Sequence, residues 1–150
     1  MNLVVDIGNS FIKSAVFKGE DIVMLKSFRI SEYDLLVSGI NDYPVKRAIV
    51  SSVSLSIDFI SSSLKNKIKY VLFPNLNTRL PFKNLYLDKE TLGFDRIAAA
   101  AGAQALFPGE NIIIIDAGTA ITIDVVTKEG QFIGGNISPG VDMRFKALNE

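Results

Sequence analysis

The chain has 150 residues, 48% of them hydrophobic, and its 16 basic residues balance its 16 acidic ones. This length predicts one large domain or slightly more, and the neutral charge gives no gross basic surface for nucleic acid. Cysteine and histidine are absent, which excludes disulfides, thiolate metal sites and histidine catalysis, so acid–base chemistry must use Asp, Glu, Lys or Tyr. No apolar run is long enough for a membrane span and no basic leader precedes the first strand, so we expect a soluble cytoplasmic protein without membrane partners.

The first half of the chain alternates predicted strands with a predicted helix. Apolar alternation and turn residues predict strands over residues 2–7, 11–17, 21–30, 47–53 and 69–73. The helical spacing of Ile57, Ile60 and Leu64 predicts a helix over 56–65. Residues 75–92 show no regular pattern, and a loop of that length in a compact domain is usually functional or mobile.

The second half begins with a predicted helix and continues with strands. An alanine-rich stretch predicts a helix over 95–107, which Pro108-Gly109 ends. The four isoleucines of 112–115 predict a central strand covered on both faces. Two further strands and a helix from Val141 follow. Helices between strands indicate an α/β architecture.

One short motif occurs twice, 110 positions apart. Asp6-Ile7-Gly8 and Asp116-Ala117-Gly118 each end an apolar strand and precede a second strand, a hairpin turn and a third strand. A carboxylate and a glycine turn at a strand end suit a phosphate–metal site. Two such turns predict a nucleotide held between two related halves: a complete lobe at 1–110 and the incomplete start of a second at 111–150.

The first copy carries more phosphate-binding groups than the second. Gly8 permits a tight turn, while Asn9, Ser10 and Lys13 offer donors and a positive charge to phosphate oxygens. An ordinary hairpin is the alternative, because Gly-Asn is a common turn dipeptide. The second copy has Ile123 in the position of Lys13, which suits cation and nucleotide positioning better.

Two further motifs lie outside the repeat. Gly93-Phe94-Asp95-Arg96 stands at the start of the predicted 95–107 helix, where an aspartate usually serves as a cap or dipole partner. Tyr86 precedes this motif in the long loop, and we expect it to form part of a mobile wall beside the motif. Residues 134–140 contain three glycines, whose amides either approach a ligand or form a plain connection.

Taken together and in this order, these motifs resemble those of type III pantothenate kinase, of the acetate and sugar kinase/Hsp70/actin superfamily. The resemblance runs through the whole chain and rests on Asp-x-Gly-Asn-Ser with Lys13, Leu-Gly-Phe-Asp-Arg, Asp-Ala-Gly-Thr-Ala-x-Thr and Gly-Gly-x-Ile-x-Pro-Gly. It implies a ribonuclease H-like (actin-like ATPase) fold. The implied activity is phosphorylation of pantothenate by ATP, the first step of coenzyme A biosynthesis, by a homodimer.

The resemblance also implies roles for individual residues. Asp95 is the expected general base, Asp116 the ligand of a monovalent cation (K⁺ or NH₄⁺), and Asp6 a tentative Mg²⁺ ligand through water. The expected ATP-binding residues are Asp6, Ile7, Gly8, Asn9, Ser10, Phe11, Ile12, Lys13 and Thr119. The expected pantothenate-binding residues are Tyr86, Gly93, Phe94, Asp95 and Arg96.

The chain departs from the family pattern in two places. Thr91 replaces a proline found in many members, which we expect to loosen the substrate loop without removing a reacting group. The family's chain also continues past residue 150. The alternatives are another small-molecule kinase of the superfamily and a non-catalytic nucleotide-binding or regulatory relative.

Overall fold

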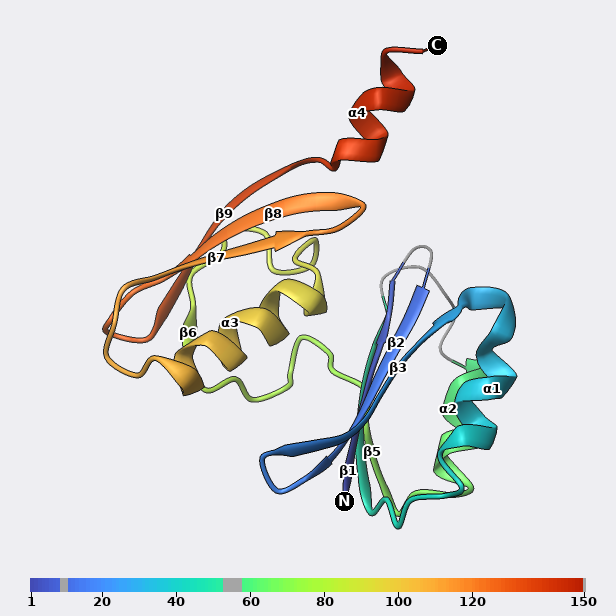
Figure 1. The fold of residues 1–150 in the computed structure, drawn as a ribbon. Helices are drawn as coiled ribbons and strands as arrows, with labels where there is room; N and C mark the ends of the chain where they lie inside the picture. Colours follow the sequence, from blue (N-terminus) through green and yellow to red (C-terminus); the bar gives the residue numbers. More distant parts are fainter. Residues whose placement is uncertain (9–10, 53–57, 150) are drawn as a thin grey trace. The chain divides into compact units, whose positions relative to one another are not determined.

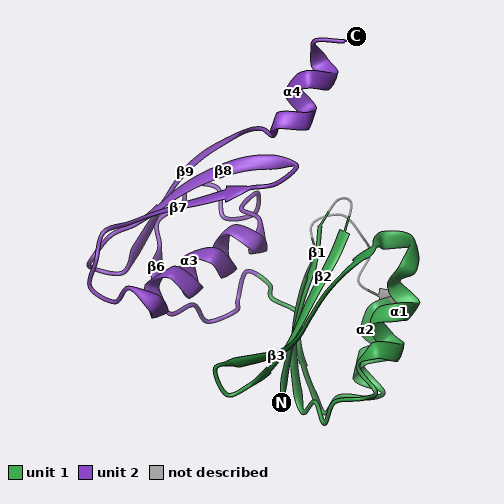
Figure 2. Ribbon diagram, in the orientation of Figure 1, with its two compact units in different colours: residues 1–75 green, residues 76–150 purple. Residues whose placement is uncertain are grey.

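The computed structural model describes residues 1–8, 11–52 and 58–149, without the side chains of 58 and 59. The chain forms two compact units, residues 1–75 and 76–150 (Figure 2). Each unit has its own sheet and its own hydrophobic core. The two units are therefore described separately.

The first unit is built on a five-stranded sheet of order β3-β2-β1-β4-β5. An antiparallel meander of three strands comes first, and two parallel strands then extend it on the other side of β1. The strands are β1 (Asn2–Ile7), β2 (Phe11–Lys18), β3 (Asp21–Arg29), β4 (Arg47–Ser52) and β5 (Tyr70–Leu72). The predicted strands are confirmed to within one or two residues at the described ends. In β1, β2 and β4 buried and exposed side chains alternate.

Two helices cover one face of this sheet (Figure 1). They are α1 (Tyr33–Gly39), which follows a 3₁₀ turn at Ile30–Glu32, and α2 (Asp58–Lys65). Leu36 of α1 and Leu64 of α2 are buried with Leu3, Val5 and Val50 of the sheet. The sequence did not predict α1. The start of the predicted 56–65 helix falls on residues 56 and 57, which lie outside the described part.

The second unit has a four-stranded sheet of order β6-β9-β8-β7, with one long helix packed on it. Its elements are β6 (Lys83–Asn84), α3 (Phe94–Leu106), β7 (Ile112–Ala117), β8 (Ala120–Val126), β9 (Gln131–Pro139) and α4 (Val141–Ala147). Ile97 and Ala100 of α3 are buried with Val126 and Phe132 of the sheet. The fold is therefore mixed α/β with two sheets, as expected.

The strand of four isoleucines is not covered on both faces, so that prediction was wrong. β7 lies at the edge of its sheet, and Ile113 and Ile115 are 68% and 66% exposed. Ile112 and Ile114 pack with the core under α3. In the described part of the chain, α3 thus covers only one face of β7, and the run of apolar residues did not reveal this.

The compact units part after residue 75, whereas the repeat suggested lobes of 1–110 and 111–150. The difference comes from α3, which packs against the sheet of the second unit. In the described part of the chain, no helix is long and apolar enough to cross a membrane.

Candidate functional site

The first Asp-x-Gly turn closes the β1–β2 hairpin. The N–H of Gly8 donates to the carbonyl of Phe11 at 3.0 Å, and the last register pair, Ile7 with Ile12, leaves four residues in the connection. Ile7 and Ile12 are fully buried, so their side chains hold the hairpin in the core and only their backbone can face a ligand. Asn9 and Ser10, both predicted ATP-binding residues, lie outside the described residues.

Asp6 lies in a polar row that crosses three strands. In the register of the sheet it stands between Lys13 of β2 and Ser51 of β4. The hydroxyl of Ser51 donates to Asp6 Oδ1 at 3.0 Å. Asp6 is half-buried and Lys13 is exposed. Because Val5 and Ile7 point into the core under the helices, this row lies on the opposite face, next to the turn.

The second Asp-x-Gly turn is one residue shorter than the first. Its last register pair, Ala117 with Ile121, leaves only three residues between the strands, and Thr122 stands opposite Asp116. Thr122, and not Ile123, therefore occupies the position that Lys13 has in the first hairpin, which corrects the sequence comparison. Asp116 is exposed at the end of β7.

The glycine-rich fourth motif contacts this second turn. The N–H of Gly140, at the start of α4, donates to the carbonyl of Thr119 at 2.9 Å. The exposed Thr119, a predicted ATP contact, is thus held at its backbone while its side chain faces outward. The two motifs form one local structure although 20 residues of sequence lie between Thr119 and Gly140.

The third motif begins α3. Gly93 is the N-cap residue and offers no side-chain cap, and Asp95 is in the first turn. Asp95 Oδ1 accepts a hydrogen bond from the N–H of Arg96 at 2.8 Å. The half-buried carboxylate therefore lies at the positive end of the helix dipole, with one oxygen engaged by the backbone.

Arg96 is buried and paired inside the protein. Its Nε and Nη2 atoms donate to the two carboxylate oxygens of Asp124 at 2.9 and 2.5 Å, and the two side chains are only 4% and 2% exposed. The hydrogen bonds to Asp124 raise the pKa of Arg96 above its ordinary value, although burial alone would lower it. Because the folded-state pKa is the higher one, the pair stabilises the fold at neutral pH and loses this contribution only above the ordinary range of arginine.

Tyr86 completes this cluster. Its half-buried ring lies 5.2 Å from the Arg96 guanidinium carbon and 6.3 Å, centroid to centroid, from Phe132. It also lines a cavity of about 280 Å³ together with Leu85, Leu87, Asp88, Thr91, Ile133 and Gly135. The structure thus brings Tyr86 and Arg96, ten residues apart, into contact beside a hollow.

Thr91 is hydrogen-bonded within the loop that precedes this motif. Its N–H and its hydroxyl both donate to the carbonyl of Asp88, at 3.3 and 3.1 Å. Proline, which lacks both groups, makes neither bond. Thr91 therefore makes two hydrogen bonds in the loop that proline at this position would not make.

Sequence reasoning missed Asp124. One signal was present: strand alternation puts it on the same face as Val126, and a charged residue at an inward position needs a buried partner. What the sequence did not give was the identity of that partner, 28 positions away. In the sequence repeat, the matching residue of the first hairpin is the buried Ser14.

The donor set limits where metal ions can bind. Among residues 1–8, 11–52 and 58–149, no three Asp or Glu side chains form a cluster that could hold a metal ion. Asp6, with one oxygen bonded to Ser51, fits a Mg²⁺ ion that is held mainly by water and substrate phosphates. Asp116 offers one exposed carboxylate beside the Gly118 turn.

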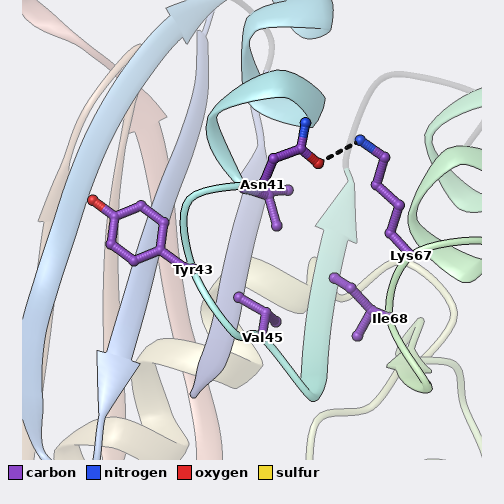
Figure 3. A pocket seen from close by; sticks show the side chains of 6 residues that line it. Asn41, Tyr43, Val45, Lys67 and Ile68 are labelled. Carbon is purple, nitrogen blue, oxygen red and sulfur yellow. Dashed lines mark hydrogen bonds between the residues drawn. The ribbon is translucent and has the colours of Figure 1, made fainter.

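A second cavity of about 280 Å³ lies at the other end of the first sheet (Figure 3). Val45 and Ile68 line it just before β4 and β5 begin, whereas ligands of parallel strands usually bind at the carboxyl ends. Its lysine, Lys67, donates to Asn41 Oδ1 at 2.7 Å and to the carbonyl of Val37 near the end of α1 at 3.3 Å. These bonds give Lys67 a structural role in capping the C-terminal end of α1.

The mixed α/β fold, with a carboxylate–glycine turn after an N-terminal strand of each sheet, is consistent with a nucleotide-binding protein. The sequence model of type III pantothenate kinase matches residues 2–150. The chain therefore belongs to the type III pantothenate kinase family.

Individual relatives agree with this assignment. A type III pantothenate kinase of Phocaeicola vulgatus is 43% identical over 152 residues, which cover 99% of this chain and 62% of the relative. One from Bacteroides fragilis is 43% identical over 150 residues, with 100% and 62% covered. A solved structure of a Campylobacter jejuni protein, named for the Baf family of transcriptional activators, has a TM-score of 0.57 and 25% identity, covering 97% of this chain and 58% of its own. The chain spans about 62% of the length of the curated relatives.

Proposed function

We propose that the whole protein transfers the γ-phosphoryl group of ATP to the primary alcohol of pantothenate. The product is 4′-phosphopantothenate, and the reaction is the first step of coenzyme A biosynthesis. The observation that carries this proposal is the cluster at the start of α3, where Asp95 is next to Arg96, and the Arg96 guanidinium lies over the Tyr86 ring beside a cavity. Family membership supports the reaction, and this cluster supports the choice of this place for the acceptor.

Asp95 is the proposed general base. Its carboxylate takes the proton of the pantothenate hydroxyl while that oxygen forms a bond to the γ-phosphorus, and the bond from phosphorus to the β–γ bridging oxygen breaks to release ADP. The transition state is loose, so a carboxylate is basic enough. A positioned base contributes roughly 10²–10⁴ in rate.

The polar row around Asp6 is the proposed site of the ATP phosphates. Lys13 brings a positive charge to the exposed face next to the Gly8 turn. We assign Thr119 of the second turn to ATP as well. When bound, Mg²⁺ at Asp6 and a monovalent cation at Asp116 would neutralise phosphate charge.

Three wider features belong to the same proposal. The strand order of the first unit, a three-stranded meander extended by two parallel strands, supports a ribonuclease H-like fold. The family resemblance supports a homodimer and a cytoplasmic location.

The direct test is Asp95→Asn in the longest natural protein that contains this chain. The Asn side-chain oxygen can still accept the Arg96 N–H bond, so we expect normal folding and a kcat roughly 10²–10⁴ lower. Asp142→Asn is a matched control, because Asp142 is an exposed first-turn aspartate of α4; its kcat should not change. Near-normal turnover by the folded Asp95 variant would sink the base assignment.

Substrate and cation are tested separately. ATP turnover is measured with pantothenate, with acetate and with simple sugars, which separates this function from that of another kinase of the superfamily. Exchange of K⁺ for Na⁺ should lower the rate if Asp116 binds the cation. ATP binding without turnover on any acceptor would indicate a non-catalytic relative.

A further inference from the structure

Arg96 and Asp124 are the buried charged side chains in the described part of the chain. An ion pair removed from water is expensive, and apolar residues of similar size often stabilise a core as well or better. Stability alone therefore gives a weak reason for this pair. Its position, directly after the proposed base and against Tyr86, gives a different one.

The pair fixes the plane of the guanidinium. Both oxygens of Asp124 accept hydrogen bonds from two different nitrogens of Arg96. Such a two-point contact sets orientation as well as distance, which a single hydrogen bond does not. The guanidinium carbon of the Arg96 side chain held in this way lies over the ring of Tyr86, 5.2 Å from its centroid.

Tyr86 is held from other sides as well. Gly134 has a φ of +87°, and a side chain built on it would collide with the Tyr86 ring. The ring is also tilted at 40° against Phe132. Tyr86 is thus fixed between β9 and Arg96, and from there it lines the cavity of about 280 Å³.

We infer that Asp124 is a positioning residue for pantothenate: through Arg96 it fixes Tyr86 as a wall of the acceptor site. This inference rests on the proposed function and names a residue that the motifs did not contain. Asp124 itself contacts neither substrate. Its loss should therefore disturb the acceptor site and leave the Asp6 row of the ATP site unchanged.

The test compares Asp124→Asn with the wild type in the longest natural protein that contains this chain. We expect KM for pantothenate to rise roughly 10- to 100-fold, because small displacements of positioning groups have effects of this order. KM for ATP should differ from the wild-type value by no more than about 2-fold, because the substitution leaves the Asp6 row in place. Thr127→Val is the matched control, since it removes a buried hydroxyl just after β8 that has no hydrogen-bond partner among the described residues; both KM values should be unchanged.

A second measurement does not depend on turnover. The Nε–H signal of Arg96 and the ring signals of Tyr86 are followed by NMR, with assignment by Arg96→Lys and Tyr86→Phe. In the wild type the Nε–H should exchange slowly and respond to pantothenate; in Asp124→Asn the Tyr86 ring signals should shift. Unchanged Tyr86 signals in a folded Asp124→Asn protein, or equal rises in both KM values, would overturn the inference.

Failure of the proposed function gives a different result. If the wild type does not phosphorylate pantothenate, the substrate assignment is wrong, whereas the Tyr86 signals still report whether Asp124 holds the ring. If Asp124→Asn does not fold, the inference is tested by the NMR titration of the wild-type protein with pantothenate. Arg96 and Tyr86 signals that ignore saturating pantothenate in an active enzyme would contradict the inference.

Discussion

At the scale of single residues, the position of Asp95 depends on the glycine two places before it. The Asp95 carboxylate folds back over the start of α3, and a side chain built on Gly93 would collide with Oδ1. The backbone of Gly93 is extended, with φ −61° and ψ 138°, so other residues can adopt its conformation. The glycine is therefore needed for space and not for its dihedral angles.

We predict that Gly93→Ala lowers kcat by roughly 10-fold or more, because the new methyl group displaces the Asp95 carboxylate from its place at the helix start. The free energy of unfolding should change by no more than about 1 kcal/mol, since only an N-cap position is altered. Steady-state kinetics and urea unfolding of the same preparation measure the two effects.

Gly102→Ala is the matched control for this substitution. Gly102 lies in the same helix, and a side chain there meets nothing within 4 Å. Alanine at this exposed position should stabilise the protein by about 0.5–1 kcal/mol and leave kcat unchanged. If both variants lose activity to the same extent, space for Asp95 is not the reason for the glycine at 93.

At the scale of elements, the two hairpins share a sequence pattern but differ in register. The first connection has four residues and brings Lys13 opposite Asp6, whereas the second has three and brings Thr122 opposite Asp116. The one-residue difference decides which side chain shares a face with the carboxylate. Only the first hairpin therefore has a lysine opposite its carboxylate in the strand register.

We predict that Lys13→Met lowers kcat/KM for ATP roughly 10- to 100-fold, the value of a lost charge-assisted hydrogen bond. Folding should be unaffected because Lys13 is exposed. Lys18→Met, an exposed lysine at the far end of β2, loses the same charge away from the turn and should keep its kcat/KM. Equal losses in the two variants would point to a general charge effect instead.

The sequence predicted most of these elements because their signals are local. The strands of the first meander are apolar runs separated by Gly-Asn and Lys-Gly-Glu turn residues, and Pro108-Gly109 does follow the last turn of α3. The short helix α1 was missed because its inward face contains little more than Leu36 and Ile40. A two-residue strand such as β6 exists only through its parallel pairing with β9, which no local pattern records.

For the candidate site too, the sequence predicted the features that depend on neighbouring residues and missed those that depend on distant ones. The residues of the third motif, Gly93 to Arg96, were found because they are contiguous in sequence. The contact of Tyr86 with Arg96 joins that motif to the loop just before it. Asp124 was missed because its partner lies 28 positions away. The exposure of Ile113 and Ile115 was missed because a run of isoleucines indicates a buried strand but does not show whether one face or both faces of the strand are covered.

At the scale of the whole molecule, the chain has two separate cores. Leu64 is fully buried in the first, together with strands β1 and β4, and Phe132 is fully buried in the second, against α3 and β8. Each core is closed by side chains of its own unit. Local stability should therefore follow the units and not the chain as a whole.

We predict that Leu64→Ala and Phe132→Ala each weaken one unit, by about 2–5 and 3–5 kcal/mol respectively, because each leaves a cavity in one core. Native-state hydrogen exchange separates the effects: Leu64→Ala should speed exchange in β1 and β4 while β8 and β9 keep their protection, and Phe132→Ala should do the reverse. A loss of protection in both units from either substitution would show that the two cores unfold as one cooperative body.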